Sequence, residues 1–168
     1  AAVAASAMQA GEMDWWEYTP TDLQAMMEKS KGVTVTPKDP YNWYGIARFN
    51  HLQPPFNNVK LRRAVLAAVN QDDYMRAAFG DDHRTWRACR AMMPCGVFGV
   101  TEFGTSAMPA VSIDVAKKMV ADSGYKGERA VVLAPMDYPQ LGTFGQVTAD
   151  LFKKIGINVD FVPMDWGT

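Results

Sequence analysis

Residues 48–80 constrain the fold of this chain most strongly, because they combine a rigid turn with two consecutive helix signals. The proline pair at 54–55 lacks backbone N–H groups and favours an extended turn. Asn57 or Asn58 can then accept hydrogen bonds from the free amides that begin a helix. We therefore predict a helix over 59–69, with an apolar stripe and a basic face.

A second helix is predicted directly after the first. Asn70 and Asp72 can cap its start, and Gly80 can end it. Before the proline pair, the apolar run at 43–50 is typical of a strand. We expect three side chains of the second helix to face inward: Tyr74, Ala77 and Ala78.

The N-terminal residues carry weaker signals of the same kind. Residues 3–10 are helical in pattern, and Gly11 stands where a helix would end. Thr21 is placed to cap a helix that runs through Lys31. The short β-branched run at 33–36 predicts a strand after it.

The C-terminal part of the chain is typical of an α/β fold. Ser112 can cap a helix, and residues 129–133 form a continuous apolar strand, as in a sheet covered on both faces. A helix and an alternating strand at 157–162 follow, and this strand–helix–strand order predicts a right-handed parallel crossover. One face of that helix is expected to point into the core: Leu141, Phe144, Thr148, Leu151, Phe152 and Ile155.

The loop that follows the strand at 129–133 holds the first candidate ligand contacts. Open α/β sheets bind ligands at the carboxyl ends of their strands. Asp137, Tyr138 and Gln140 lie in this loop, and a plain role as turn residues is the alternative.

A second group of candidates lies nearer the N-terminus. Trp43 and Tyr44 belong to an aromatic run that is denser than one strand needs, and aromatic side chains commonly line small-molecule sites. Glu17 and Tyr18 follow Trp15 and Trp16, and these two tryptophans beside carboxylates can form a ligand platform or pack beneath a lobe. Packing is the alternative role for the aromatic residues of both groups.

Residues 81–111 have no helical or strand periodicity and are longer than a usual connection, which indicates either function or mobility. We expect the large side chains of this segment to cover the edges of the core: Trp86, Phe98 and Phe103.

Composition excludes several classes of protein. Hydrophobic residues make up 48% of the 168 residues, so the chain can bury a core and is not disordered. The formal net charge of −1 gives no general attraction to nucleic acid. No apolar run approaches the ~20 residues that span a bilayer. The first ten residues lack the basic start of a signal peptide and look like a helix that begins inside a larger protein.

Three stretches of the sequence resemble one protein family. They are AMQAGEMDWWEYTP, then FN with PPFNNVKLRRAVLAAVNQDDYM, and finally VAKKMVADSGYKGERAVVLAP with FKKIGINVDFV. In this order they resemble periplasmic solute-binding proteins that serve dipeptide and oligopeptide ABC importers, extracellular solute-binding protein family 5. Each motif alone is weak, but together they cover nearly the whole chain.

The resemblance implies part of a type II periplasmic-binding-protein-like fold, with a mixed sheet flanked by helices. It assigns residues 1–45 to a hinge-proximal segment of the first lobe and 46–168 to an incomplete second lobe. It implies a periplasmic, non-enzymatic binder that captures a peptide or related small solute and delivers it to a membrane permease. No cofactor, metal or nucleic acid is expected. The expected ligand-binding residues are Glu17, Tyr18, Trp43, Tyr44, Asp137 and Tyr138.

Two cysteines, Cys89 and Cys95, leave several possibilities open. The periplasmic resemblance and their close spacing favour a disulfide, and two buried thiols are the alternative. A zinc site with His51 and His83 is a third possibility, although the spacing of common zinc motifs is absent.

No catalytic motif is present in the sequence. It contains neither G-x-S-x-G, H-E-x-x-H nor a glycine-rich phosphate loop. The second functional hypothesis is therefore a protein-interaction module that keeps the lobe fold without transporting a solute.

Overall fold

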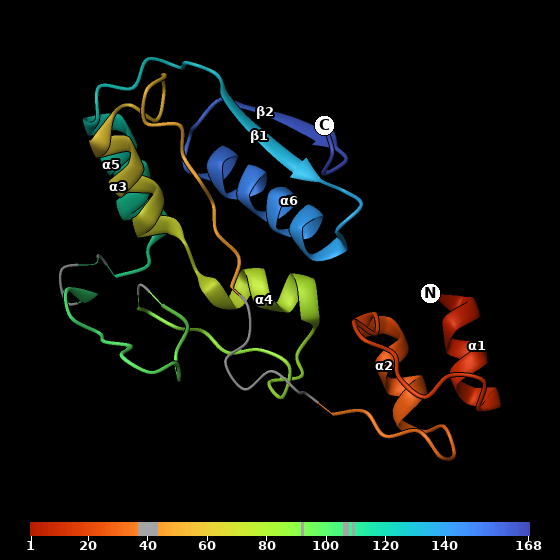
Figure 1. Cartoon of the computed structure of the whole chain (residues 1–168). Helices are drawn as coiled ribbons and strands as arrows, with labels where there is room; N and C mark the ends of the chain where they lie inside the picture. The colour runs from red at the N-terminus through yellow and green to blue at the C-terminus, as the bar shows by residue number, and fades with distance from the viewer. Residues whose placement is uncertain (37–43, 92, 106–107, 109) are drawn as a thin grey trace. The chain divides into compact units, whose positions relative to one another are not determined.

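The computed structural model describes residues 1–36, 44–91, 93–105, 108 and 110–168 (Figure 1). The chain forms two compact units, Ala1–Pro40 and Tyr41–Thr168. The assignment of 1–45 and 46–168 to two lobes of a larger protein stays a prediction.

The smaller unit is a pair of helices, α1 (Ala2–Ala10) and α2 (Thr21–Glu28). The prediction that Gly11 ends the first helix is confirmed: its φ is 73°, which glycine adopts without steric cost. Gln9 joins the two helices through a 2.9 Å hydrogen bond from its Nε2 atom to Ser30 Oγ. Two apolar residues of this unit are fully buried, Ala5 and Met27.

Three predictions for this unit were wrong. Pro20 is the N-cap of α2, because its carbonyl accepts from Leu23 N and Gln24 N, so Thr21 is already helical. The helix ends at Glu28 rather than at Lys31, and two tight turns follow it. Residues 33–36 form no strand, since nothing in the described chain pairs with them.

In the larger unit, the predicted caps define the helices. Asn58 caps α3 (Val59–Ala68), and its Oδ1 accepts from Lys60 N and Leu61 N at 2.9 and 3.3 Å. Asn70 caps α4 (Gln71–Phe79), which ends at Gly80. The peptide bond between Pro54 and Pro55, just before α3, is cis. The proline turn and both helices are therefore confirmed.

The helix α5 (Ile113–Asp122) packs against α3, as Figure 1 shows. Ser112 caps α5 with its hydroxyl, and its backbone amide donates to Ala67 O of α3 at 2.9 Å. At the other end, Asn58 Nδ2 donates to Ser123 O at 2.9 Å. Hydrogen bonds at both ends thus hold the helix pair in register.

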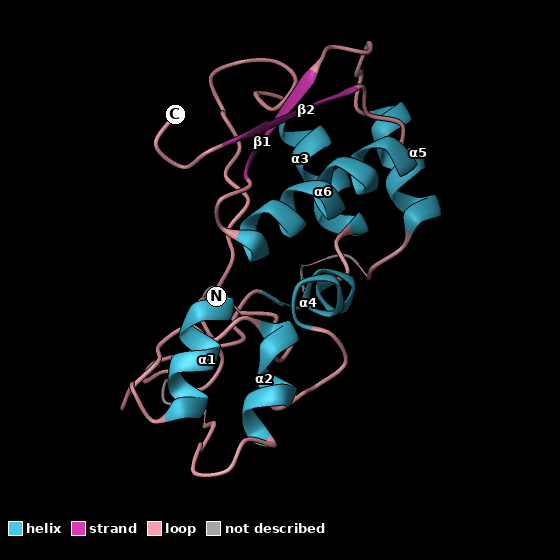
Figure 2. Ribbon diagram, turned by 90° about the vertical axis from the view of Figure 1, so that its right-hand side faces the viewer, coloured by secondary structure: helices cyan, strands magenta, loops and turns pink. Residues whose placement is uncertain are grey.

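The C-terminal part is a β–α–β unit: β1 (Ala130–Pro135), α6 (Pro139–Lys154) and β2 (Val159–Met164). The two strands pair in parallel, with Ala130 opposite Val159 and Leu133 opposite Val162. Figure 2 shows α3, α5 and α6 on one side of these strands. The predicted parallel pairing and the α/β class are confirmed.

The core of the larger unit is a cluster of aromatic and aliphatic side chains. The rings of Phe49 and Phe56 lie 4.6 Å apart, and Phe56 lies 5.6 Å from Phe152 of α6. Leu61 and Ile155 are fully buried in the same cluster. The cluster joins the segment before the proline turn to α3 and α6.

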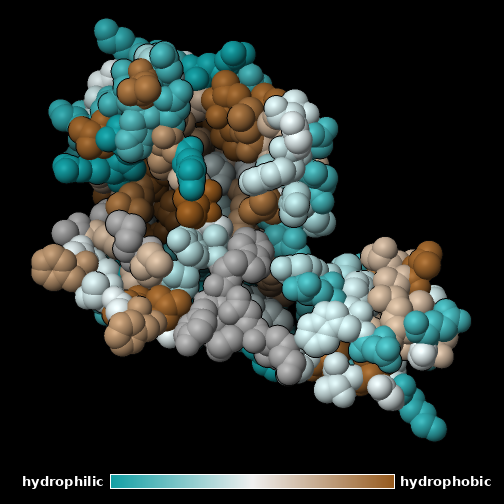
Figure 3. All heavy atoms as spheres, viewed as in Figure 1, coloured by the Kyte–Doolittle hydropathy of each residue, from teal (hydrophilic) through white to brown (hydrophobic). Residues whose placement is uncertain are grey.

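Predictions of a strand and of burial in the larger unit were wrong. Residues 44–50, the described part of the predicted 43–50 strand, form no strand, and Gly45 lies against the Phe144 ring. On β1, Val131 and Leu133 are 44% and 61% exposed, because the described helices cover only the opposite face of the sheet. Figure 3 shows apolar residues at the surface of the larger unit.

The long segment 81–111 also differs from expectation in part. It contains turns and loops throughout its described residues, as predicted. Trp86 is buried, and its Nε1 donates to Gly80 O at 2.8 Å. Phe98 and Phe103, however, are 104% and 94% exposed and cover no core. On α4, Ala77 is exposed rather than inward-facing.

Candidate functional site

The candidate site lies at the edge of the sheet where both parallel strands end. Because β1 and β2 run in the same direction, the residues that follow them meet at this edge. Met136 N donates to Met164 O at 2.8 Å and extends the pairing by one more step. The chain then turns into α6 after β1, and into 165–168 after β2.

Three side chains come together beyond this last backbone contact. Asp137 Oδ1 accepts from the backbone amide of Trp166 at 2.9 Å. The rings of Tyr138 and Trp166 meet edge to face, with centroids 5.6 Å apart and planes at 63°. Tyr138 is 52% exposed and Trp166 is 66% exposed. The cluster is thus ordered by its own contacts and still open to solvent.

The start of α6 contributes to the same edge. Tyr138 is the N-cap residue but makes no side-chain capping bond, and Pro139 occupies the first turn. The positive end of a helix of this length favours negative charge nearby. Farther along α6, the hydroxyls of Thr143 and Thr148 donate to backbone carbonyls one turn earlier in the same helix.

Close packing fixes the position of α6 relative to the strands. A side chain at Gly145 would place its Cβ atom 2.5 Å from the Cβ of Ala134 on β1, so only glycine allows this approach. On a neighbouring face of the helix, Tyr74 Oη of α4 lies 3.2 Å from Thr148 Oγ1, and burial raises the pKa of the Tyr74 phenol. These contacts hold the helix that presents Tyr138.

Within the larger unit, the structure brings together two of the predicted ligand-binding residues, Asp137 and Tyr138. Glu17 and Tyr18 are exposed in the smaller unit, and Tyr18 has a φ of 59°, which is unusual for a residue with a side chain. Tyr44 is 47% exposed in the larger unit, next to the glycine that packs on α6. Trp43 lies outside the described residues.

Trp166 is the member of the cluster that sequence reasoning missed. Its signal was available: it follows the strand that was predicted to pair in parallel with β1, so it had to emerge beside the 136–138 loop. The short polar sequence around it, MDWGT, has no periodicity of its own.

The hollows found on the surface lie elsewhere. A shallow depression of about 430 Å³ lies at the C-terminal end of α6, lined by Lys117, Tyr125, Lys153 and Lys154 among others. A second one follows the outer face of α1. Within the described residues, no three His, Cys, Asp or Glu side chains are grouped to hold a metal ion. The exposed Asp137–Tyr138–Trp166 cluster lines neither of these two hollows.

The two cysteines form a disulfide. Their Cα atoms lie 5.7 Å apart across the Cys89–Cys95 bond. The rings of His83 and Trp86 lie tilted at 46° to each other, with their centroids 4.2 Å apart. With both sulfurs joined to each other, neither cysteine is a thiolate ligand or nucleophile in this form.

Comparison with known proteins decides the family. The model for bacterial extracellular solute-binding proteins, family 5 Middle, matches residues 1–168. This chain belongs to that family. It is 32% identical over 171 residues to a probable peptide ABC transporter periplasmic-binding protein of Sinorhizobium fredii. The match covers 96% of this chain and 30% of the relative, so the chain spans less than a third of that protein's length.

Solved structures of solute-binding proteins share the fold of this chain. The ABC transporter substrate-binding protein CtaP of Listeria monocytogenes superposes with a TM-score of 0.83 at 23% identity, over 98% of this chain and 33% of CtaP. A dipeptide-binding protein of Pseudoalteromonas, in complex with Met-Leu, gives a TM-score of 0.54 at 25% identity, over 71% of this chain and 24% of that one. No helix in the described part of the chain has the length and apolar character to cross a membrane.

Proposed function

We propose that this chain is part of the substrate-binding component of an ABC importer and forms one wall of a cleft for a peptide or related small solute. The family match over the whole chain carries the proposal. The exposed cluster of Asp137, Tyr138 and Trp166 supports it, because it lies where open α/β sheets bind ligands.

The chemistry of the cluster suits a peptide. The exposed rings of Tyr138 and Trp166 offer flat apolar surface at a small cost in side-chain entropy. Asp137 uses Oδ1 to hold Trp166, and no described residue bonds its Oδ2, which can accept from an ammonium or amide group. A peptide supplies both apolar side chains and N–H donors.

The mechanism that we infer is closure of two lobes around the solute, followed by delivery to a membrane permease. A closed form is favoured only when the ligand contacts both lobes at once. Glu17, Tyr18, Trp43 and Tyr44 remain proposed contacts from other parts of the site. We place the protein in the periplasm and assign it no enzymatic activity, in keeping with the solute-binding family to which it belongs.

Calorimetry on the full-length protein that contains this segment tests the proposal. We expect saturable heat with di- or oligopeptides, and a loss of affinity of about tenfold or more for Trp166→Ala or Tyr138→Ala. Phe103→Ala is the control, because it removes an exposed aromatic ring that lies outside the cluster. Unchanged affinity in both cluster variants would exclude this wall from the site.

The ligand class is tested in the same titrations. Heat with sugars, opines or metal chelates, and none with any peptide, would replace the peptide by that class. A protein that gives neither heat nor a change in tryptophan emission with any solute, yet co-purifies with a membrane complex, would support the interaction-module hypothesis instead.

A further inference from the structure

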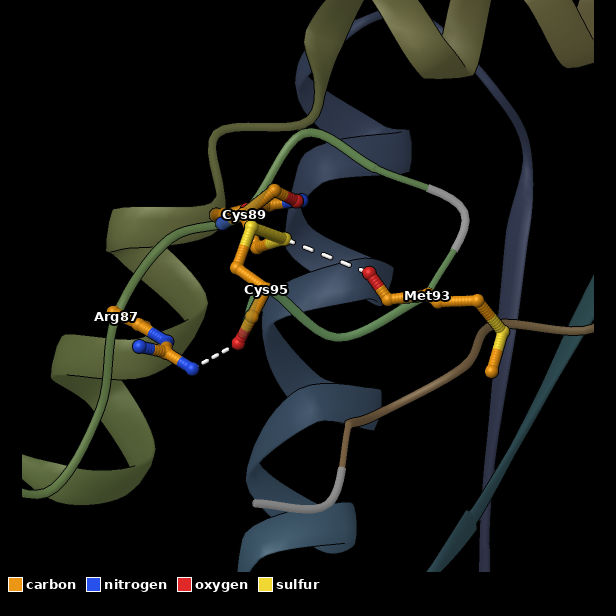
Figure 4. Close-up of a disulfide and its surroundings, with 5 residues drawn as sticks. Arg87, Cys89, Met93 and Cys95 are labelled. Carbon is orange, nitrogen blue, oxygen red and sulfur yellow. Dashed lines mark hydrogen bonds between the residues drawn. A yellow bond between two sulfur atoms is a disulfide. The ribbon is translucent and has the colours of Figure 1, made fainter. Parts of the chain in front are cut away.

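The disulfide lies in the loop between α4 and α5 (Figure 4). The part of this loop that contains Cys89 and the part that contains Cys95 are held in different ways. Cys89 and Cys95 are both partly exposed, and the exposed Met93 places its carbonyl oxygen 3.7 Å from Cys89 Sγ. The small ring that the disulfide closes is therefore at the surface and within reach of a soluble reductant.

The backbone of Cys89 is tied to α4 without help from the disulfide. Gln71 Nε2 donates to Cys89 O at 2.7 Å, and Cys89 N donates to Gln71 Oε1 at 2.6 Å. Gln71 is the first residue of a helix that is capped by Asn70. Upstream in the loop, Trp86 is buried and bonded to Gly80 O. The N-terminal half of the loop is thus anchored at two points.

The backbone of Cys95 has a weaker hold. Its carbonyl accepts a hydrogen bond from the Arg87 side chain, as Figure 4 shows. Arg87 is itself exposed. The neighbouring backbone bond, from Val97 N to Pro94 O at 3.4 Å, is local to the turn. Among the described residues, no hydrogen bond connects 93–96 directly to a helix or strand.

We propose that the Cys89–Cys95 bond is a redox-sensitive brace that holds residues 93–96 against the part of the loop anchored by Gln71. A dithiol reductant attacks one sulfur through its thiolate and forms a mixed disulfide, and its second thiol then closes a cyclic disulfide. The reductant loses two electrons, and both cysteines leave as thiols. Reduction then frees 93–96, whereas Cys89 stays on α4.

Amide-resolved hydrogen exchange on the full chain, with and without dithiothreitol, tests this asymmetry. We expect reduction to accelerate exchange at the Val97 amide, which donates to Pro94 O, by about tenfold or more, while the Cys89 amide changes by less than about threefold. Amides of α3, α5 and α6 should not change. Equal loss of protection at Cys89 and at Val97, no change at either, or loss across the helices would overturn the proposal.

Two variants sharpen the test. Cys89→Ser with Cys95→Ser should reproduce the exchange pattern of the reduced chain and show no response to dithiothreitol. Gln71→Ala keeps the disulfide but removes the acceptor of the Cys89 amide, so this amide should lose protection even before reduction. A Cys89 amide that stays protected in Gln71→Ala would show that Gln71 is not the anchor.

Discussion

At the scale of single residues, glycines in α6 decide how closely this helix can approach the strands. A Cβ atom added at Gly145 would lie 2.5 Å from the Cβ of Ala134, which is attached directly to the backbone of β1. At Gly142 the nearest atom is the sulfur of Met136 at 3.1 Å, the far end of a flexible side chain. The same substitution should therefore have different consequences at two sites about one turn apart.

We expect Gly145→Ala to lower the free energy of unfolding by about 1–3 kcal/mol, because the helix must move away from β1. Gly142→Ala is the matched control and should be neutral or slightly stabilising, since alanine restricts the unfolded chain and Met136 can turn away. Urea unfolding of both variants measures the difference. Equal stability of the two variants would contradict the close approach.

Asp82 lies in the segment 81–111, which contains the disulfide, and the pKa of its carboxyl is clearly lowered. Hydrogen bonds from the Arg84 side chain, and then from its backbone amide, hold the pKa of the Asp82 carboxyl at about 2, below its usual 3.8. Because this folded-state pKa is depressed, the contact favours folding above the usual carboxyl range and is lost as the pH falls toward 2.

Carboxyl-carbon NMR across a pH titration checks this shift. We expect Arg84→Ala to raise the pKa of Asp82 toward its usual value, although the backbone amide at 84 can still donate. Arg76→Ala is the control: it removes the ion pair of the adjacent Asp81 and should leave the pKa of Asp82 low. A pKa that is already normal in the parent chain would rule out the contact.

At the scale of elements, Asn58 joins two helices as well as starting one. Its Oδ1 caps α3, and its Nδ2 donates to the carbonyl of Ser123 at the end of α5. The Asn58 side chain therefore makes hydrogen bonds both within its own helix and to another helix, and suitable substitutions can remove one kind or both.

We expect Asn58→Ala to cost about 1–2 kcal/mol, since both bonds are lost. Asn58→Asp keeps the capping acceptor but removes the donor and places a carboxylate next to Ser123 O. If the tertiary bond matters, Asp will be less stable than Asn by chemical denaturation at pH 7. An Asp variant as stable as the parent chain would show that Asn58 acts as a cap alone.

The contact between α4 and α6 depends on a hydroxyl pair. Thr148 Oγ1 already donates to Phe144 O, so the proton in the 3.2 Å contact with Tyr74 comes from the tyrosine. We expect Tyr74→Phe to lower the free energy of unfolding by about 1 kcal/mol. The ring contact with Phe144 should remain, and near-UV circular dichroism can check this.

At the scale of the whole molecule, the two units differ in how much core they contain. The aromatic cluster of Phe49, Phe56 and Phe152 lies entirely within the larger unit, with Leu61 and Ile155. The smaller unit buries far less, and chains below about 40 residues rarely fold alone without disulfides, metals or association.

We therefore expect a chain of residues 41–168 to unfold cooperatively, with a near-UV signal from its buried aromatic rings. A peptide of residues 1–40 should show little helix in far-UV circular dichroism, because two short helices are marginal in water without packing. A cooperative transition in the peptide, or a loss of cooperativity in the longer piece, would contradict this division of the core.

The exposed face of the sheet and the contact between Trp166 and Tyr138 could not be predicted from local sequence patterns, for a common reason. The exposure of Val131 and Leu133 depends on which elements cover the sheet, and an apolar run is the same whether one or both faces are buried. Phe98 and Phe103 are exposed although their hydrophobicity favoured burial. Trp166 joins Tyr138 only because two strands pair across the length of α6.

The sequence by itself determined the helix starts at Asn70 and Ser112 and at one of Asn57 or Asn58, the ends at Gly11 and Gly80, and the family, since caps and motifs act over a few neighbouring residues. Only the tertiary structure decided which residues share the C-terminal edge of the sheet and which part of the disulfide loop is anchored. Those features depend on contacts between residues far apart in the chain, and no local pattern encodes them.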